Sequence, residues 1–335
     1  MTLKIILLGI IFGIILQYAK LNKYNVISGL AILENLTVAK ALAIAVGAGA
    51  ILLSIETGLG FATYHIKPFL LVGIIAGGFI FGVGMAILGY CPGTMAVSLG
   101  EGSLDALIGI LGALTGGFIF TLVLPAIKGI LGPDLGTISL MSFTGKNALF
   151  YILSIVLGGA FIWLAFFLHR KEKALDYKWL YTGLGLAVLD GIIFLTSAFN
   201  RPIGASTSYP YLADMLTGTT SNDYFTAIQK PGHWEMLFLI GAILAGLLNS
   251  INRKEFKLTL IHSNWERFKG KSPAKRIFWA FTGGFILLFG ARMAGGCTSG
   301  HILSGGMQLA VSSLVFAVFV FAGLLITGKL FYKGS

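Results

Sequence analysis

The sequence Gly89-Tyr90-Cys91-Pro92-Gly93-Thr94 (GYCPGT) holds one of the two cysteines of this 335-residue chain. The other is Cys297, in the stretch GGCTSGH over residues 295–301, which lies 297 − 91 = 206 positions later. The segments before the two cysteines agree in register. Gly-Gly-Phe-Ile begins fourteen residues before each cysteine, and single glycines stand seven and two residues before it. A proline opens each segment at nearly the same offset, at residues 68 and 273. We therefore predict an internal repeat centred on the two cysteines.

The Cys91-Pro92 pair predicts the start of a second helix, because proline is favoured at the first helical position. Free N–H groups at a helix start form an anion site. The glycine amides and hydroxyls around Cys297 offer similar groups. Either cysteine taken alone would favour a packing residue near a glycine kink, but the duplication reverses this and favours a substrate site. The expected substrate-binding residues are Cys91, Pro92, Gly93, Thr94, Gly296, Cys297, Thr298, Ser299, Gly300 and His301.

The composition is 56% hydrophobic and only 11% charged, whereas soluble globular chains average about 25% charged residues. We therefore expect an all-α polytopic membrane protein, in contact with the lipid bilayer. The net charge of +11 is better explained by positive loops on one membrane side than by nucleic-acid binding. Two cysteines in separate segments do not predict a metal site, and no phosphate-binding loop, nucleophile elbow or zinc His-Glu motif is present. We expect a protein that is not an enzyme and needs no cofactor or metal.

The apolar segments predict about nine membrane spans, of which we retain the first as a span rather than a signal peptide. They cover about 3–19, 38–55, 68–90, 104–127, 147–168, 179–199, 235–251, 276–294 and 309–328. The two cysteine stretches follow the third and the eighth span. Both are made of apolar and small residues, which suits re-entrant loops or half-helices that line a cavity.

Alternating spans would put 17 of the 24 Lys and Arg residues on one side, which we expect to be cytoplasmic. The amino terminus would then lie outside and the carboxyl terminus in the cytoplasm. The two cysteine stretches are five spans apart, so their repeats are inverted. We expect a first repeat over 1–146, a linking span and basic loop over 147–178, and a second repeat over 179–335. Inverted repeats with broken helices are typical of transporters that bind substrate near the membrane midplane.

A weaker echo places Asn22 nine residues after Gly13, and Asn200 nine residues after Gly191. We expect a supporting set of polar residues around the site: Asn22, Asn200, Glu56 and His65. Glu101 and Arg292 are further ionisable residues beside the cysteine stretches. Ionisable groups at membrane depth are costly and tend to be functional. Solvation at the membrane interface is an equal alternative for His301 and the favoured one for Glu56, His65, Glu101 and Arg292. The basic run from Arg253 to Arg276 predicts an interfacial helix, which could dock an acidic partner.

With GYCPGT after a glycine-rich span and GGCTSGH after GARMA, the chain resembles the YeeE/YedE family of sulfur-compound permeases over nearly its whole length. The resemblance implies thiosulfate uptake across the bacterial inner membrane through a central constriction. There Cys91 and Cys297 would pass thiosulfate on by transient thiol contacts. Some family members carry a third cysteine where this chain has Asn22, which puts a three-thiol relay in doubt. A small soluble sulfur-carrier protein of the TusA type is the implied partner. We expect it to be a separate protein, because seven residues follow the last expected span.

Thiosulfate is a dianion, so helix amides can bind it without a fixed counter-charge that would trap it. Neutral thiols suit its soft terminal sulfur, whereas thiolates would repel it. We therefore expect both cysteines to be protonated at rest. Two alternatives stay open at this point. One is a membrane thiol–disulfide oxidoreductase using Cys91 and Cys297, and the other is a transporter for another soft solute, such as a selenium compound or a metal ion.

Overall fold

The computed structural model describes residues 1–172 and 175–333. The described residues form helices and loops but no β-strand, and only isolated β-bridges join some of the loops. The helices in chain order are α1 (Thr2–Tyr18), α2 (Tyr24–Ala31), α3 (Thr37–Gly58), α4 (Leu71–Leu88), α5 (Pro92–Gly100), α6 (Leu104–Leu131), α7 (Leu140–Thr144), α8 (Ala148–Glu172), α9 (Lys178–Phe194), α10 (Ser208–Thr217), α11 (Asp223–Asn252), α12 (Ser263–Lys269), α13 (Pro273–Met293), the π-helix η1 (Thr298–Leu303), α14 (Ser304–Met307) and α15 (Val311–Phe331).

The protein is an all-α polytopic membrane protein, as predicted. Seven helical segments of the described chain are long and apolar enough to cross a membrane, and α1 is a shorter apolar helix. Two of the seven run through the cysteine stretches: 71–100 covers α4 and α5, and 273–307 covers α13, η1 and α14. The expected total of nine spans stays a prediction.

Two expected helix boundaries and one expected helix are wrong. The helix expected over 179–199 ends at Phe194, and the one expected over 235–251 begins at Asp223. The longer helix includes Pro231 and the polar residues before it, whose composition hid its start. The basic run from Arg253 to Arg276 is not one interfacial helix, because only Ser263–Lys269 is helical before α13 begins.

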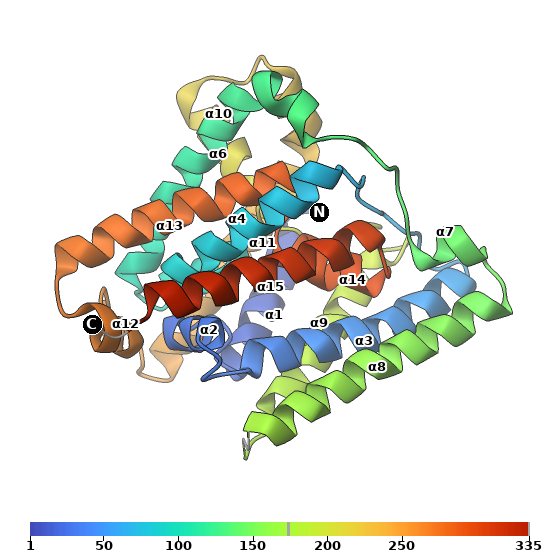
Figure 1. Cartoon of the computed structure of the whole chain (residues 1–335), viewed down its shortest axis with the longest axis horizontal. Helices are drawn as coiled ribbons and strands as arrows, with labels where there is room; N and C mark the ends of the chain where they lie inside the picture. The colour runs from blue at the N-terminus through green and yellow to red at the C-terminus, as the bar shows by residue number, and fades with distance from the viewer. Residues whose placement is uncertain (173–174, 334–335) are drawn as a thin grey trace.

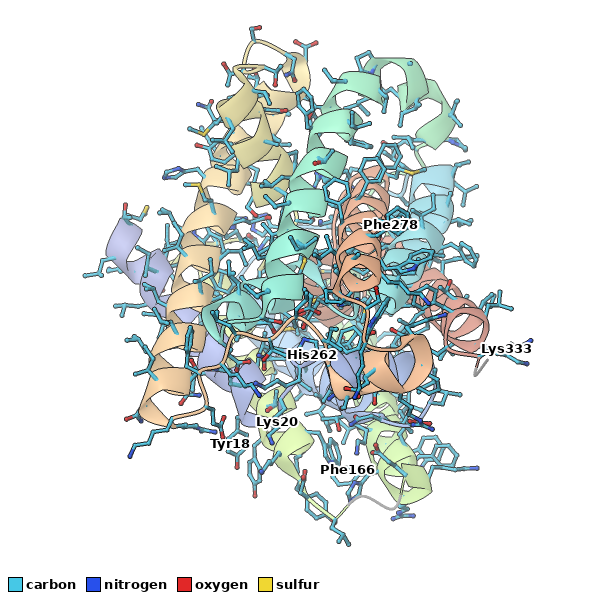
Figure 2. All side chains as sticks on the ribbon, turned by 90° about the vertical axis from the view of Figure 1, so that its left-hand side faces the viewer. Tyr18, Lys20, Phe166, His262, Phe278 and Lys333 are labelled. Atoms are coloured by element: carbon cyan, nitrogen blue, oxygen red, sulfur yellow. The ribbon has the colours of Figure 1, made fainter. Side chains whose placement is uncertain are left out.

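We call the end of the molecule that carries Lys20, His262 and Lys333, which are labelled in Figure 2, the basic face. Contacts there join distant parts of the chain: Lys23 pairs with Glu101 at 2.6 Å, and Asn25 accepts a hydrogen bond from the backbone of Asn264. The opposite face carries the segments 59–70, 132–147 and 195–222. They are held together by backbone bonds such as that from Phe69 N–H to Gly136 O, at 2.9 Å.

At the centre, α4 and α13 pack against each other, with α15 on the other side of α4 (Figure 1). The repeated glycines of the sequence lie at this contact. A Cβ on Gly84 would come within 2.3 Å of the Leu287 backbone, and one on Gly290 within 2.5 Å of the Phe81 backbone. The glycines therefore let the two helices approach more closely than larger residues would allow. This contact sets the positions of both cysteine stretches, since each follows one of the two helices.

Candidate functional site

Cys91 stands at the break between α4 and α5. Gly89 ends α4 in the left-handed conformation, with φ of 80°, and a Cβ there would lie 2.3 Å from the Tyr24 ring. Cys91 is then the N-cap of α5, and Pro92 is its first residue, as the sequence predicts. The Cys91 N–H donates to Thr94 Oγ1 at 2.8 Å, and the Thr94 hydroxyl lies 3.3 Å from the Cys91 sulfur. The break thus holds the thiol at a helix start with a hydroxyl beside it.

A broken helix leaves backbone carbonyls without partners, which is costly at membrane depth. The guanidinium of Arg276, from α13, donates to Leu88 O at 2.8 Å and to Ile87 O at 3.4 Å. The same group is paired with Asp105 of α6 through an Nε–Oδ2 contact of 3.1 Å. Arg276 and Asp105 are both fully buried. This ion pair therefore caps the end of α4 and fixes the place where Cys91 emerges.

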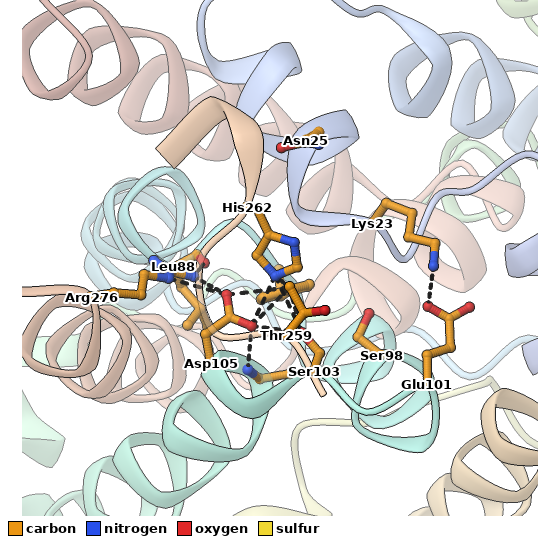
Figure 3. Close-up of polar contacts among 12 residues, drawn as sticks. Lys23, Asn25, Leu88, Ser98, Glu101, Ser103, Asp105, Thr259, His262 and Arg276 are labelled. Atoms are coloured by element: carbon orange, nitrogen blue, oxygen red, sulfur yellow. Dashed lines mark hydrogen bonds and ion pairs between the residues drawn. The ribbon is translucent and has the colours of Figure 1, made fainter. Parts of the chain in front are cut away.

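A polar network extends this support to the basic face (Figure 3). The Tyr90 hydroxyl lies 3.0 Å from both Ser103 Oγ and His262 Nε2, and His262 Nε2 lies 3.0 Å from Asp105 Oδ1. Tyr90 directly precedes Cys91, so the network anchors the residue next to the thiol.

The second break is built differently. Gly295 adopts φ of 72°, and Cys297 is the N-cap of η1, with its sulfur 3.3 Å from Ser299 Oγ. His301 is fully buried, and both of its ring nitrogens are engaged. Nε2 lies 2.8 Å from Ala294 O, and Nδ1 lies 2.9 Å from Ser313 Oγ. His301 therefore ties the carbonyl at the end of α13 to α15 and sits behind the loop.

The two cysteine stretches line one cavity. Cys91 and Thr94 contribute from the first, Thr298 and Ser299 from the second, and the remaining walls are largely apolar side chains such as Phe12. The cavity volume is about 50 Å³, enough for more than one water molecule. Cys297 lies just behind this wall, buried and next to Thr298 in the chain.

Thr298 has a buried hydroxyl oxygen with no hydrogen-bond partner among the described residues. A buried polar group without a partner costs free energy, about 1–3 kcal/mol. An unpartnered hydroxyl at the wall of a cavity is therefore a group that a polar substrate could satisfy.

The segment 200–209, of which the sequence analysis singled out only Asn200, runs between the two breaks. The Tyr209 hydroxyl donates to Pro92 O at 2.8 Å, and a Cβ on Gly93 would come within 3.8 Å of Ala205. At the other break, a Cβ on Gly300 would lie 3.7 Å from Ile203 O. This segment therefore bridges the two stretches, although nothing in its sequence marks it as part of a site.

A profile described as sulphur transport matches residues 23–326. The chain belongs to the sulphur transport family. It is also 26% identical over 340 residues to the thiosulfate transporter TsuA of Spirochaeta thermophila, with 95% of each chain covered. Members of this family are transporters, in agreement with the expectation that the protein is not an enzyme.

Of the ten residues expected to bind substrate, the cavity is lined by Cys91, Thr94, Thr298 and Ser299. Pro92, Gly93, Gly296 and Gly300 belong to the same two turns, where they are packed against other parts of the chain.

The four supporting residues do not form one cluster. Asn22 is buried near the basic face, where its Nδ2 donates to Ser98 Oγ at 3.3 Å. Asn200 accepts from the Thr63 hydroxyl at 2.7 Å and lies 3.1 Å from His65 Nε2, both on the opposite face. Glu56 lies near the C-terminal end of α3, beside Gly191.

The sequence analysis missed a cationic side chain that lies against the Cys297 turn. Lys67, in the segment before α4, donates from Nζ to Gly295 O at 2.6 Å. A Cβ on Gly296 would lie only 2.0 Å from Nζ, so the ammonium rests directly on the cysteine turn. Nothing in the sequence marks Lys67 as part of a site, because a lone lysine between apolar segments is indistinguishable from a solvated loop residue.

Proposed function

We propose that this protein takes up thiosulfate, or a closely related sulfur oxyanion, through a passage between its two cysteine stretches. The observation that carries the proposal is the cavity lined by both stretches, with Cys91 and Thr94 on one side and Thr298 and Ser299 on the other. Membership of the sulphur transport family and the likeness to a thiosulfate transporter support the choice of substrate.

The chemistry of the lining suits transient binding. Hydroxyl groups donate hydrogen bonds to the oxygens of the anion, while a neutral thiol contacts its terminal sulfur. Most other lining residues are apolar, so the anion is held weakly enough to leave, as conduction requires. Cys91 and Cys297 would receive the substrate in turn and remain chemically unchanged at the end of each passage.

The repeat hypothesis belongs to this proposal: 1–146 and 179–335 are two inverted halves, joined by 147–178. Reciprocal contacts support it. Gly77 packs against Ala294, and the residues 206 positions away from each, Gly283 and Leu88, pack against each other in the same way. Such a pair of contacts is expected from two related halves that meet face to face.

We also propose that the protein lies in the bacterial inner membrane with the basic face in the cytoplasm, which follows from the positive-inside rule. The amino terminus would be outside and the carboxyl terminus inside. A small cytoplasmic TusA-like sulfur carrier would then receive the product at the basic face, where Lys20 and Lys333 are labelled in Figure 2.

Growth on thiosulfate as sole sulfur source tests the proposal, in a bacterium that lacks its own sulfate and thiosulfate importers. The strain carries the native chain, Cys91→Ala or Cys297→Ala at matched membrane expression, each with and without a co-expressed sulfur carrier. We expect growth with the native chain and none with either alanine variant. Absence of growth with the native chain under both conditions would overturn thiosulfate uptake. Growth that survives both substitutions would overturn the role of the thiols.

A further inference from the structure

Two cationic side chains lie beside Cys297, on the side toward the opposite face. No carboxylate among the described residues forms a salt bridge with either of them. The first is Lys67, whose Nζ lies on the Gly295-Gly296 turn. The residue is half-buried and its backbone carbonyl accepts a hydrogen bond from Ser312 Oγ at 3.1 Å, so the side chain is anchored at its base and reaches inward. A Cβ on Gly300 would also lie 3.0 Å from Nζ. The turn thus surrounds the ammonium with glycine backbone.

The second cation is Arg292, at the end of α13 and five residues before Cys297. It is buried, and its hydrogen-bond partners are all hydroxyl groups: Tyr224 at 2.7 Å, Thr207 at 3.1 Å and Ser206 at 3.3 Å. Hydroxyls orient a guanidinium but do not neutralise it. Lys67 Nζ binds Gly295 O, three residues after Arg292, so the two positive charges lie at the same turn and repel each other.

The carboxylate of Glu235 lies near these cations but already interacts with other groups. Glu235 is buried, lies 3.7 Å from Arg201 Nη2 and accepts the Thr207 N–H at 2.7 Å. Arg201 also stacks on the Trp234 ring at 4.1 Å. Among the described residues, neither Lys67 nor Arg292 forms a salt bridge with a carboxylate. Two positive charges therefore remain uncompensated beside the turn.

Burying like charges side by side is costly, and the cost falls when an anion of matching charge binds between them. We propose that Lys67 and Arg292 form a binding site for a doubly charged oxyanion, directly before Cys297 on the path of the substrate. This inference rests on the proposed function and names the step by which the anion is selected. It also revises the expectation that backbone amides bind the anion without a fixed positive charge.

The contact between Lys67 and Gly295 O explains how such a site could release its ligand. In the structure the ammonium donates to this carbonyl. A bound dianion would draw the ammonium away from the carbonyl, and the carbonyl would take it back as the anion moves on to Cys297. The ammonium of Lys67 can therefore move, whereas the guanidinium of Arg292 is held in place by its three hydroxyl partners.

The first test reads the local charge without using transport. In a Cys91→Ser chain, Cys297 is the single thiol, and its rate of modification is compared for an anionic and a cationic methanethiosulfonate reagent. We expect the ratio of anionic to cationic rate to fall roughly tenfold or more in Lys67→Met, in the range of electrostatic steering effects. Lys67→Arg should keep the ratio. Lys128→Met is the matched control, because Lys128 is exposed on the opposite face and far along the chain from the turn.

The second test measures uptake of thiosulfate by proteoliposomes that contain the otherwise native chain. We expect Lys67→Met to raise KM roughly tenfold with a smaller change in the maximal rate, Lys67→Arg to restore KM, and Lys128→Met to leave it unchanged. An unchanged KM together with an unchanged reagent ratio in Lys67→Met would overturn the cation site and leave the proposed function standing. Absence of uptake by the native chain would overturn the proposed function, and a fall in the reagent ratio would then still support an anion site at Lys67.

Discussion

The two cysteine stretches break their helices in the same register but are supported by different chemistry. The break at Cys91 is capped by Arg276, which is fully buried and paired with the equally buried Asp105. The break at Cys297 is supported by the neutral ring of His301, and the nearby ammonium of Lys67 is half-buried and lies on the turn itself.

The difference separates two tasks within one passage. At the Cys91 end, charge is balanced and serves the structure, so the thiol is the chemically distinctive group there. At the Cys297 end, positive charge is uncompensated and accessible from the opposite face. We infer that the anion is selected by charge at the Cys297 end and by its sulfur at both thiols. Sulfate and thiosulfate would then bind alike at Lys67 and differ at the cysteines.

The largest effect is expected from Arg276→Met. The substitution leaves Asp105 buried without its cation and frees the carbonyls of Ile87 and Leu88, so it should destabilise the protein by about 3–5 kcal/mol. Thermal unfolding in detergent and uptake by proteoliposomes would both show the loss.

The matched control for that substitution is Arg267→Met, which removes an exposed pair with Glu34 and should cost less than about 1 kcal/mol. The double variant Arg276→Met, Asp105→Asn should recover part of the stability, because the unpaired charge is gone. Equal losses for Arg267→Met and Arg276→Met would contradict the structural role of the buried pair.

A smaller and more local effect is expected from His301→Ala. The change removes the bonds to Ala294 O and Ser313, which should cost about 1–3 kcal/mol and loosen the turn that buries Cys297. Alkylation followed by peptide mass spectrometry should show faster modification of Cys297 and little change at Cys91. The same acceleration at both cysteines would point to general unfolding instead.

The pH dependence of uptake should follow the charge of Lys67, at the Cys297 end of the passage. Burial, together with the charge of Arg292, lowers the pKa of Lys67 to about 8, so the ammonium is charged below that pH and loses its charge above it. Thiosulfate remains a dianion across this range, and KM should therefore rise as pH increases through about 8.

The charged and titratable groups that face Lys67 are Arg292, Arg201, Glu235, Cys297 and His301. The Lys67→Arg variant distinguishes the contribution of Lys67 from that of the other groups, because arginine keeps its charge over this pH range. In that variant the rise in KM should disappear. A rise of the same size in Lys67→Arg would assign the pH dependence to another group, with the Cys297 thiol the first to examine.

The smallest effect is expected from Asn22→Cys. The amide of Asn22 makes only a long contact with Ser98, at 3.3 Å, and its Oδ1 has no partner among the described residues. A thiol at this position should therefore change KM for thiosulfate by no more than about threefold, which is under 1 kcal/mol. Loss of uptake in Asn22→Cys, with the protein still folded, would show that the amide itself contacts the substrate.

The sequence predicts much of this arrangement because its signals are local. Apolar length indicates membrane helices, Cys91-Pro92 marks a helix start, and the repeated glycines mark close helix packing; α5 and the α4–α13 contact agree with these expectations. The contacts that are missed join residues far apart in the chain. Arg276 and Asp105 are 171 positions apart, and Arg276 looks like one more residue of a solvated basic run.

Lys67 is missed for a related reason. Whether a lysine faces solvent or a binding site depends on where its backbone is anchored, and that anchor is Ser312, 245 positions away. The order of helices and loops expected from the sequence does not show that Ser312 lies beside Lys67. Likewise His301 is recognised as special from its motif, but its position behind the loop follows from Ser313 and Ala294, which only the folded chain brings to it.

The central claim is that thiosulfate contacts both thiols of the native chain, and alkylation in its presence tests this most directly. The purified protein would be treated with N-ethylmaleimide alone, with thiosulfate and with sulfate, and peptide mass spectrometry would follow Cys91 and Cys297 separately. We predict that thiosulfate slows modification of both cysteines, and that sulfate slows modification of Cys297 alone. Modification of both cysteines at the same rates with and without thiosulfate would contradict the account.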